Sequence, residues 1–324
     1  MPPAAFALSR RGALRTGAAA AAAALAGCSQ RSGGSAGRRR LVLASGPTDG
    51  QYEPFARRLA QELRRRVGGL TVHVLTTSAS VQNLEMLAAG RADLALALSD
   101  SAADAVAGRG AFRTPLPVTA LARIYLNYTH LVVAEDSPVR RVTDLAGRRV
   151  SLGAVGSGTA VLGERVLRAA GPPRPVRAVR LGLAESCAAL AAGEVEAFFW
   201  SGGVPTKAIA DLAARTLVRL VPLDGLVLAL RRAHGPTYVG VSVPAGTYRQ
   251  AAEVPTVGVP SYLVARRGLS SGLAETVTRV MFRARDRLPG PEVPGSYLDE
   301  RYAIGTGTVP LHPGAVRYYR SVYG

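Results

Sequence analysis

A glycine- and hydroxyl-rich turn lies near the middle of the sequence, between an apolar run and a helical pattern. The stretch 145–171 reads LAGRRVSLGAVGSGTAVLGERVLRAAG and predicts a short strand at 150–153 and a helix that ends at Gly171. Glycine lets a backbone approach a ligand closely, and the first N–H groups of a helix have no partner within it. We therefore expect a seat for a carboxylate or phosphate, with the hydroxyl of either Ser157 or Thr159 capping the helix. Its residues are Gly156, Ser157, Gly158 and Thr159.

Short polar turns also follow other apolar runs, and together with the central turn they predict a clamp around a small anion. For the serines and Asn83 the alternative is helix capping, and Asp100 can equally cap the helix that follows it. Trp200 ends an apolar run and Tyr125 lies between two, so both are expected in a cleft wall, with core packing as the alternative. The other candidate ligand contacts are Thr48, Asp49, Gly50, Tyr52, Ser78, Ser80, Ser201, Gly202 and Gly203.

Residues that would indicate catalysis or a cofactor form no known motif. The four histidines have no metal-ligand spacing, and the sequence has neither HExxH nor paired cysteines. The central turn does not fit the nucleophile-elbow, dinucleotide or Walker patterns, because Gly158 is followed directly by Thr159-Ala160-Val161, with no glycine and no lysine there. We therefore expect no enzyme, no metal and no cofactor. An enzyme on the same fold is the less favoured alternative.

Apolar runs alternate with helical patterns along most of the chain. This alternation predicts parallel strands joined by right-handed crossovers, in an α/β fold. A late extended run at 254–266 predicts that the chain returns to its first half, giving two lobes with a cleft between them. Expected strands are 41–45, 72–75, 92–98, 118–124, 131–134, 176–183 and 195–200, and expected helices are 52–67, 81–89, 184–192, 207–214, 273–286 and 315–323.

The charge balance favours no nucleic-acid partner, although the formal net charge is +18 over 324 residues. Lys207 is the only lysine, and the arginines are dispersed rather than gathered on one stretch. Binding to a phosphate backbone requires clustered basic side chains, often beside aromatic ones, and aromatic residues make up only 6% of the chain. The basic surface is instead expected to help capture anionic ligands or to contact anionic lipid.

The N-terminus has the pattern of an export signal. Paired arginines, Arg10 and Arg11, precede an alanine-rich run that ends in Leu25-Ala26-Gly27-Cys28. This run is too short to span a membrane. It predicts a twin-arginine-like signal over 1–27 with a lipobox, lipidation of Cys28 and a flexible tether over 28–40. A plain secretion signal with an incidental cysteine is the alternative.

Beyond these patterns, the sequence resembles the TAXI family, the TRAP-transporter-associated extracytoplasmic immunogenic solute receptors, over nearly all of 41–319. Two departures are Asp49, where that family usually has glycine, and Leu126-Asn127-Tyr128, which replaces a Pro-Glu-Pro-like segment. The stretches that carry the resemblance are 46–52, SVQNL at 80–84, 91–100, DLAGRRVSLGAVGSGT at 144–159, AFFWSGGVP at 197–205, YVGVSVPAGTY at 238–248, VPTVGVP at 254–260 and HPGAVRYY at 312–319.

The resemblance implies a two-lobed type II periplasmic-binding-protein fold with two crossover segments. It also implies capture of a small organic anion or a glutamate-like amino acid for a TRAP-type permease. Together with the N-terminal pattern, this predicts a monomeric lipoprotein that is anchored to the cell membrane outside the cytoplasm. A ligand-sensing lipoprotein that reports to a membrane signalling partner is the alternative. The expected lobes are 41–125 plus 261–324 for the first and 126–260 for the second.

Overall fold

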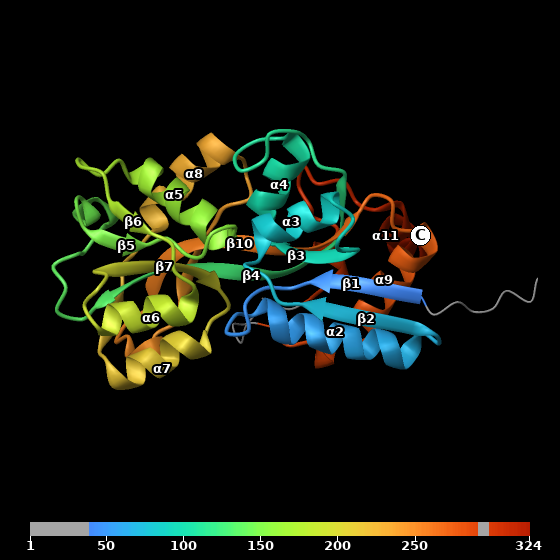
Figure 1. Ribbon diagram of the computed structural model, residues 1–324, viewed down its shortest axis with the longest axis horizontal. Helices are drawn as coiled ribbons and strands as arrows, with labels where there is room; N and C mark the ends of the chain where they lie inside the picture. The colour runs from blue at the N-terminus through green and yellow to red at the C-terminus, as the bar shows by residue number, and fades with distance from the viewer. Residues whose placement is uncertain (1–38, 291–297) are drawn as a thin grey trace, which may run out of the picture. The chain divides into compact units, whose positions relative to one another are not determined.

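Two long antiparallel strands run through both halves of one sheet and connect them (Figure 1). They are β4 (Val118–Ala134) and β10 (Val254–Arg266). At one end β10 pairs with β3 (Leu94–Leu98), and at the other it pairs with β9 (Val239–Val243). These strands are the two crossover segments.

The computed structural model describes residues 39–290 and 298–324. The predicted export signal, the predicted lipidation site Cys28 and the tether up to residue 38 lie outside the described residues. Residues 40–324 form one unit. None of the described helices has the length and apolar character needed to cross a membrane.

The sheet has the order β2-β1-β3-β10-β4-β7-β5-β6, with β8 beside β4 and β9 beside β10. Parallel pairs occur in both halves, β1 with β3 in one and β5 with β6 and β7 in the other. The strands not yet delimited are β1 (Arg39–Ala44), β2 (Leu70–Leu75), β5 (Arg149–Ser151), β6 (Arg177–Val179), β7 (Ala197–Gly202) and β8 (Val218–Leu220).

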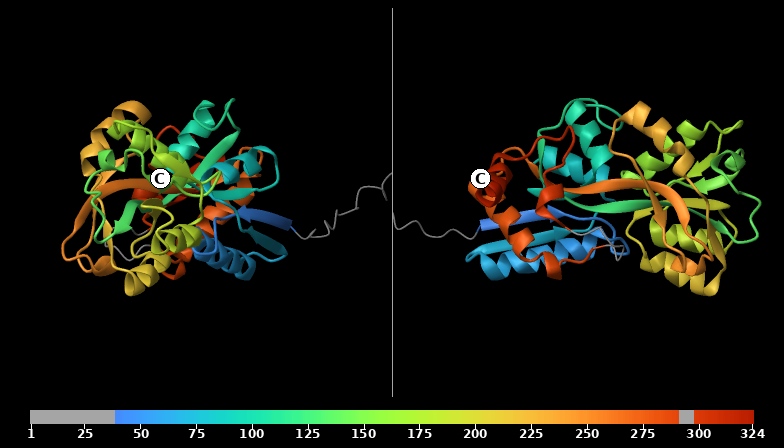
Figure 2. Two further views of the ribbon diagram at one scale, coloured as in Figure 1. Left: turned by 60° about the vertical axis from the view of Figure 1, so that its left-hand side comes forward. Right: turned by 180° about the vertical axis from the view of Figure 1, so that it is seen from behind.

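Helices cover both faces of the sheet in each half, as two further views also show (Figure 2). In α2, Phe55, Leu59 and Leu63 are spaced by four residues and all lie buried against the strands. The helices are α2 (Tyr52–Arg66), α3 (Ser80–Ala88), α4 (Ser99–Ala107), α5 (Gly158–Ala170), α6 (Leu183–Ala191), α7 (Lys207–Arg215), α8 (Val227–His234), α9 (Ser271–Arg283), α10 (Glu300–Ala303) and α11 (Pro313–Tyr323). Short 3-10 turns are η1 (Val142–Leu145), η2 (Asp224–Leu226), η3 (Thr247–Arg249) and η4 (Arg285–Arg287).

Each half has an apolar core on both faces of its sheet. In β7, the neighbours Phe198 and Phe199 point to opposite faces, and each is buried in a different cluster. We call the half with β1–β3, α2–α4 and α9–α11 the first lobe, and the half with β5–β9 and α5–α8 the second lobe. We propose that the boundaries between them lie in the crossover strands, at 125/126 and 260/261.

The α/β fold class, with two lobes and two crossover segments, is as the sequence predicts. Some local predictions were wrong. Residues 118–124 and 131–134 belong to one continuous strand, because the polar residues between them still take part in the ladder with β10 and β7. Ser80 does not cap α3 but lies in its first turn. Helix α8 was not expected, and α4 was expected only as a helix of unstated length after Asp100; it begins at Ser99, so that Asp100 lies in its first turn.

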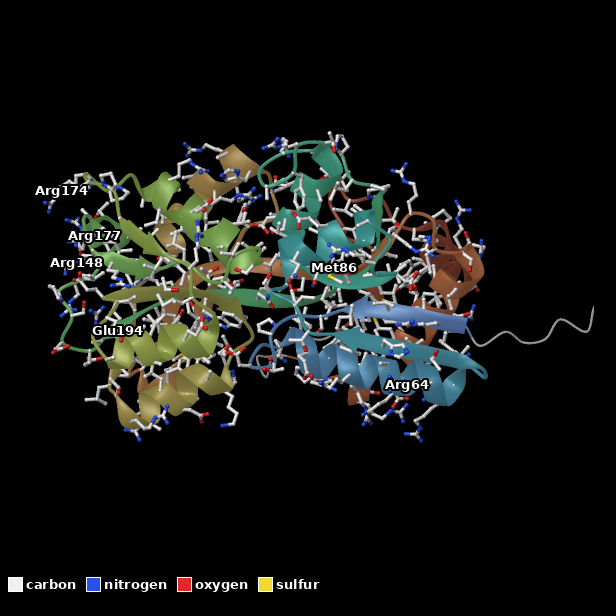
Figure 3. All side chains as sticks on the ribbon, viewed as in Figure 1. Arg64, Met86, Arg148, Arg174, Arg177 and Glu194 are labelled. Carbon is white, nitrogen blue, oxygen red and sulfur yellow. The ribbon has the colours of Figure 1, made fainter. Side chains whose placement is uncertain are left out.

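Arginine side chains are scattered over the surface (Figure 3). Arg64 lies on the first lobe, and Arg174 and Arg177 lie at the far end of the second, all of them exposed. This distribution agrees with the dispersed arginines of the sequence.

Candidate functional site

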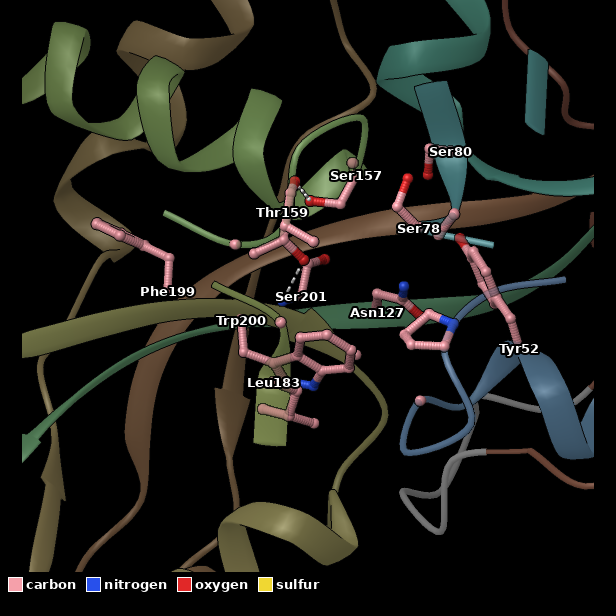
Figure 4. A pocket seen from close by; sticks show the side chains of 18 of the residues that line it. Tyr52, Ser78, Ser80, Asn127, Ser157, Thr159, Leu183, Phe199, Trp200 and Ser201 are labelled. Atoms are coloured by element: carbon pink, nitrogen blue, oxygen red, sulfur yellow. Dashed lines mark hydrogen bonds between the residues drawn. The ribbon is translucent and has the colours of Figure 1, made fainter. Parts of the chain in front are cut away.

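A cavity lies between the lobes where helix α5 begins, with about 650 Å³ of empty space counted out to its open side. The first lobe contributes the turn after β1, the start of α3 and the end of β3. The second lobe contributes the turn before α5, the start of α6 and the end of β7, and Asn127 of β4 lies between them (Figure 4). The predicted site residues that line it are Gly50, Tyr52, Ser78, Ser80, Ser157, Gly158, Thr159, Trp200, Ser201 and Gly202. We call this the first cavity.

No Asp, Glu, Lys, Arg or His is among the described residues that line the first cavity. Its polar groups are hydroxyls, amides and backbone atoms. Burial raises the pKa of the Tyr52 hydroxyl well above its usual value, so this group stays protonated and can donate a hydrogen bond at neutral pH. The Tyr52 and Ser261 hydroxyls lie 2.9 Å apart, which fixes the tyrosine ring.

The start of α5 presents backbone N–H groups to the first cavity. Ser157 caps the helix as predicted, because its Oγ accepts a hydrogen bond from Ala160 N at 3.1 Å. Gly158 and Thr159 are the first residues of the helix, so their N–H groups have no partner within it. Thr159 Oγ1 accepts from Ser201 N at 3.3 Å and ties the turn to the end of β7. This arrangement favours a compact anionic group.

Two buried oxygen atoms of the first cavity, Asn127 Oδ1 and Ser201 Oγ, have no hydrogen-bond partner among the described residues. Asn127 is 3% exposed and Ser201 is 7% exposed, so water offers them little compensation. Leaving a buried polar atom unpaired costs about 1–3 kcal/mol. The two atoms are therefore candidates for hydrogen bonds to a bound molecule.

An apolar wall faces these polar groups. Trp200 and Leu183 form it, and Phe199 lines the cavity from the other face of β7 (Figure 4). The Trp200 indole is held in place because Nε1 donates to Thr206 Oγ1 at 3.1 Å. Behind it, Tyr248 Oη accepts from Thr206 N at 2.6 Å. The wall can thus pack rigidly against the apolar part of a ligand.

The lobes touch each other around the first cavity. The Gly156 carbonyl of the second lobe accepts hydrogen bonds from Val81 N and Gln82 N of the first lobe, both at 3.1 Å. The Asp49 carboxylate of the first lobe accepts from Ala184 N at 2.9 Å, at the start of α6. Both contacts cross the cleft, so the lobes are closed on each other here.

The remaining predicted site residues do not line the first cavity. Thr48 is exposed. Asn83 is fully buried, and its Nδ2 donates to Ser45 O and Leu96 O. Tyr125 packs between Tyr52 and Phe55 in the first-lobe core. The others are Asp49 and Gly156, which form the contacts just described, Gly203, which lies against Gln51, and Asp100.

Asp100 takes part in a buried charged cluster that joins the lobes. Its Oδ2 accepts from Arg165 at 3.1 Å and from the Tyr238 hydroxyl at 2.9 Å. Arg165 also pairs with Asp104. Arg165 and Tyr238 belong to the second lobe and the two aspartates to α4 of the first, so this cluster holds the lobes together beside the first cavity.

Some lining residues were not among the predicted contacts. They include Asn127, Leu183, Ser186 and Phe199. Asn127 could have been predicted from the sequence, because it is the only amide side chain in a long, mainly apolar stretch and so gives a signal of a functional role. The residues at the start of α6 had none, because their role depends on how the second lobe faces the first.

Comparison with known proteins adds a family and a fold. A family model described as NMT1-like matches residues 43–322. The chain belongs to the NMT1-like family. This match overturns the resemblance to the TAXI family, and the TRAP-type partner that it implied loses its basis. The glycine turns and strand ends that suggested TAXI are features that the fold itself requires, so they did not identify one family.

Solved structures resemble this NMT1-like protein in fold. XAC2383 from Xanthomonas citri bound to ATP is 17% identical, with a TM-score of 0.50 over 87% of this chain and 95% of that one. A Streptococcus mutans structure on glutathione import via GshT and the cystine ABC importer TcyBC is 14% identical, with a TM-score of 0.50 over 81% and 97%. The Escherichia coli aliphatic sulphonate-binding protein SsuA is 18% identical, with a TM-score of 0.45 over 87% and 83%. The fold is that of the type II periplasmic binding proteins.

Proposed function

We propose that this NMT1-like protein is an extracytoplasmic solute-binding protein that encloses one small polar solute between its lobes. The observation that carries the proposal is a pair of buried oxygens, Asn127 Oδ1 and Ser201 Oγ. They have no hydrogen-bond partner in the part of the chain that the structure describes, and they lie in a cavity walled by both lobes. The closing contacts at Gly156 and Asp49 support it, because a binding protein must bring its lobes together around the ligand.

The walls of the first cavity define the class of solute. A single compact anionic group suits the start of α5, and a hydroxyl, amide or amine of the solute suits Asn127 Oδ1. An apolar portion suits Trp200 and Leu183. A second carboxylate would be buried without a cation, which is costly. We therefore propose a short, singly charged organic acid and not a dicarboxylate.

The proposed partner is a membrane importer of the ABC class, which receives the solute. The Streptococcus mutans structure, solved in the context of an ABC importer, is the support for this class.

We also propose export and anchoring through Cys28, on the sequence pattern alone. Incorporation of labelled palmitate that disappears in Cys28→Ala would support the anchor, and no incorporation into the wild-type protein would contradict it.

Calorimetric titration with a panel of small solutes tests the proposed function. The panel contains short singly charged carboxylates and sulfonates with and without a hydroxyl or amide group, dicarboxylates and neutral polyols. We expect one-to-one binding only in the singly charged group. Saturable binding of dicarboxylates alone, or of no member of the panel, would overturn the proposal.

The same titration on Ser201→Ala locates the binding. Removing a hydroxyl that bonds the solute is expected to weaken binding by about tenfold, or about 1.4 kcal/mol. Ser321→Ala is the matched control, because Ser321 is exposed on α11 and, within residues 39–290 and 298–324, its Oγ bonds only the Tyr318 carbonyl. Equal affinities in the two variants would place the solute elsewhere.

A further inference from the structure

A second cavity lies between the lobes, on the other side of the turn that leads into α5. It has about 1170 Å³ of empty space counted out to its open side. The first lobe contributes Asp104 and the segment 109–111 after α4, and the second lobe contributes one face of α5 and the end of α8. Ser157 lines both cavities.

Arginines outnumber carboxylates among the charged side chains that line the second cavity. Arg109, Arg165, Arg168 and Arg180 line it, whereas the lining carboxylates are only Asp104 and Glu164. Four positive charges against two negative ones leave an excess of two positive charges.

Both carboxylates already have arginine partners. Asp104 pairs with Arg165, and Glu164 pairs with Arg180. Neither carboxylate is therefore free to neutralise another guanidinium.

Two of the arginines have no ion pair among the described residues, Arg109 and Arg168. Arg109 follows α4 in the first lobe, and Arg168 lies in the last turn of α5 in the second. Arg168 lines the cavity together with Glu164 and Arg165 because residues three and four apart share one face of a helix. The unpaired guanidinium groups thus come from both lobes into one cavity.

We propose that the second cavity binds a compact, multiply charged oxyanion, held by Arg109 and Arg168. A guanidinium presents a planar pair of N–H donors that matches a carboxylate or a phosphate. Concave walls with an excess of one charge also concentrate counter-ions of the opposite charge. This site is separate from the solute site, whose walls carry no charge, and its occupation does not depend on the proposed solute.

Titration of the full chain with sodium pyrophosphate and with sodium citrate, at fixed ionic strength and without solute, tests the proposal. We expect one-to-one, saturable binding of at least one of the two anions. Binding of pyrophosphate alone would indicate a phosphate-type ligand, and binding of citrate alone a carboxylate-type ligand. Saturable binding of neither would overturn the proposal.

Paired variants locate the anion. Arg109→Gln with Arg168→Gln should raise the dissociation constant at least tenfold. Arg65→Gln with Arg91→Gln removes the same charge from exposed positions outside the cavity and should leave it unchanged. Equal weakening in both double variants would mean diffuse attraction to a basic surface and would overturn the site. Thermal midpoints confirm that both double variants are folded.

Discussion

The two cavities between the lobes lie on either side of the same turn, 153–159, but their walls differ in charge. The first has hydroxyls, amides and an aromatic wall, with no charged side chain among its described lining residues. The second has four arginines. The charged arginines are thus kept apart from the first cavity. The high net charge of the chain therefore says little about the charge of the solute that this cavity binds. The first cavity depends on helix N–H groups and buried polar atoms, and the second on guanidinium groups.

Replacing Arg165, which lines the second cavity, should have the largest effect on stability, because its charge is buried where the lobes meet. Its side chain is 6% exposed and pairs with Asp100 and Asp104. In Arg165→Met two carboxylates lose their cation, so the free energy of unfolding should fall by about 3–5 kcal/mol. Urea denaturation measures this. Arg168→Met, an exposed arginine on the same helix, is the control and should change stability little. A loss below about 1 kcal/mol for Arg165→Met would show that the cluster does not hold the lobes together.

His130 is the corresponding test for the first cavity. It lies behind the cavity wall, and its burial keeps it uncharged. It lies opposite Trp200 in the sheet and contacts Tyr248. Burial lowers the pKa of His130 from 6.5 to about 4. The unfolded chain then binds a proton that the folded protein does not, so stability is full above pH 6.5 and is lost as the pH falls toward 4. The loss should reach about 3 kcal/mol.

The measurement for His130 is urea denaturation between pH 7.5 and 4, on the wild type and on His130→Phe. Carboxylates such as Glu62 and Glu275, whose pKa values are lowered by nearby arginines, also lose stabilisation on acidification, but they do so in both proteins. The difference between the two curves therefore belongs to His130. Parallel curves would contradict a buried, neutral histidine.

Gly158→Ala tests whether close contact between the lobes is needed to form the first cavity. A Cβ at this position would lie 2.5 Å from Ser80 Oγ and 2.7 Å from Leu98 Cδ1. Ser80 cannot easily move, because its Oγ accepts from Leu98 N at 3.0 Å. Overpacking of this kind costs about 1–3 kcal/mol, so solute affinity should fall by up to about a hundredfold.

The matched control for Gly158→Ala is Gly272→Ala, on α9, where no described atom beyond the neighbouring residues and the helix's own backbone lies within 4 Å of the added carbon. Calorimetry with the solute found in the panel should give wild-type affinity for this control. If both variants bind like the wild type, the α5 turn has no part in enclosing the solute.

The fold was largely predictable because it depends on local patterns. Strands β1, β3 and β7 and helices α2, α5 and α7 follow from apolar runs and helical periodicity within short windows. The central turn was also predictable as a helix start, since Ser157 caps α5. Helix α8 was not, because its buried face is narrow and only Leu230 is fully enclosed.

The site was less predictable, because it exists only where the lobes meet. Asp49 and Asp100 read as ligand contacts from their turns, yet each is used for a contact across the cleft. In the sequence, Asn127 was noted only as part of a departure from the TAXI pattern. In the structure, its Oδ1 faces the first cavity and has no hydrogen-bond partner among the described residues. No single-sequence pattern records which residues of one lobe face which residues of the other. The family was likewise not predictable from the glycine turns, because many proteins of this fold need such turns.

The emission of Trp200 tests the central claim most directly, because it is the only tryptophan in the chain and forms a wall of the first cavity. The measurement is a fluorescence titration with the solute identified by calorimetry. We predict a saturable change in Trp200 emission with the same dissociation constant as the heat signal, and a parallel rise of both dissociation constants in Gly158→Ala. Saturable heat with unchanged Trp200 emission would place the solute outside the first cavity and contradict the account.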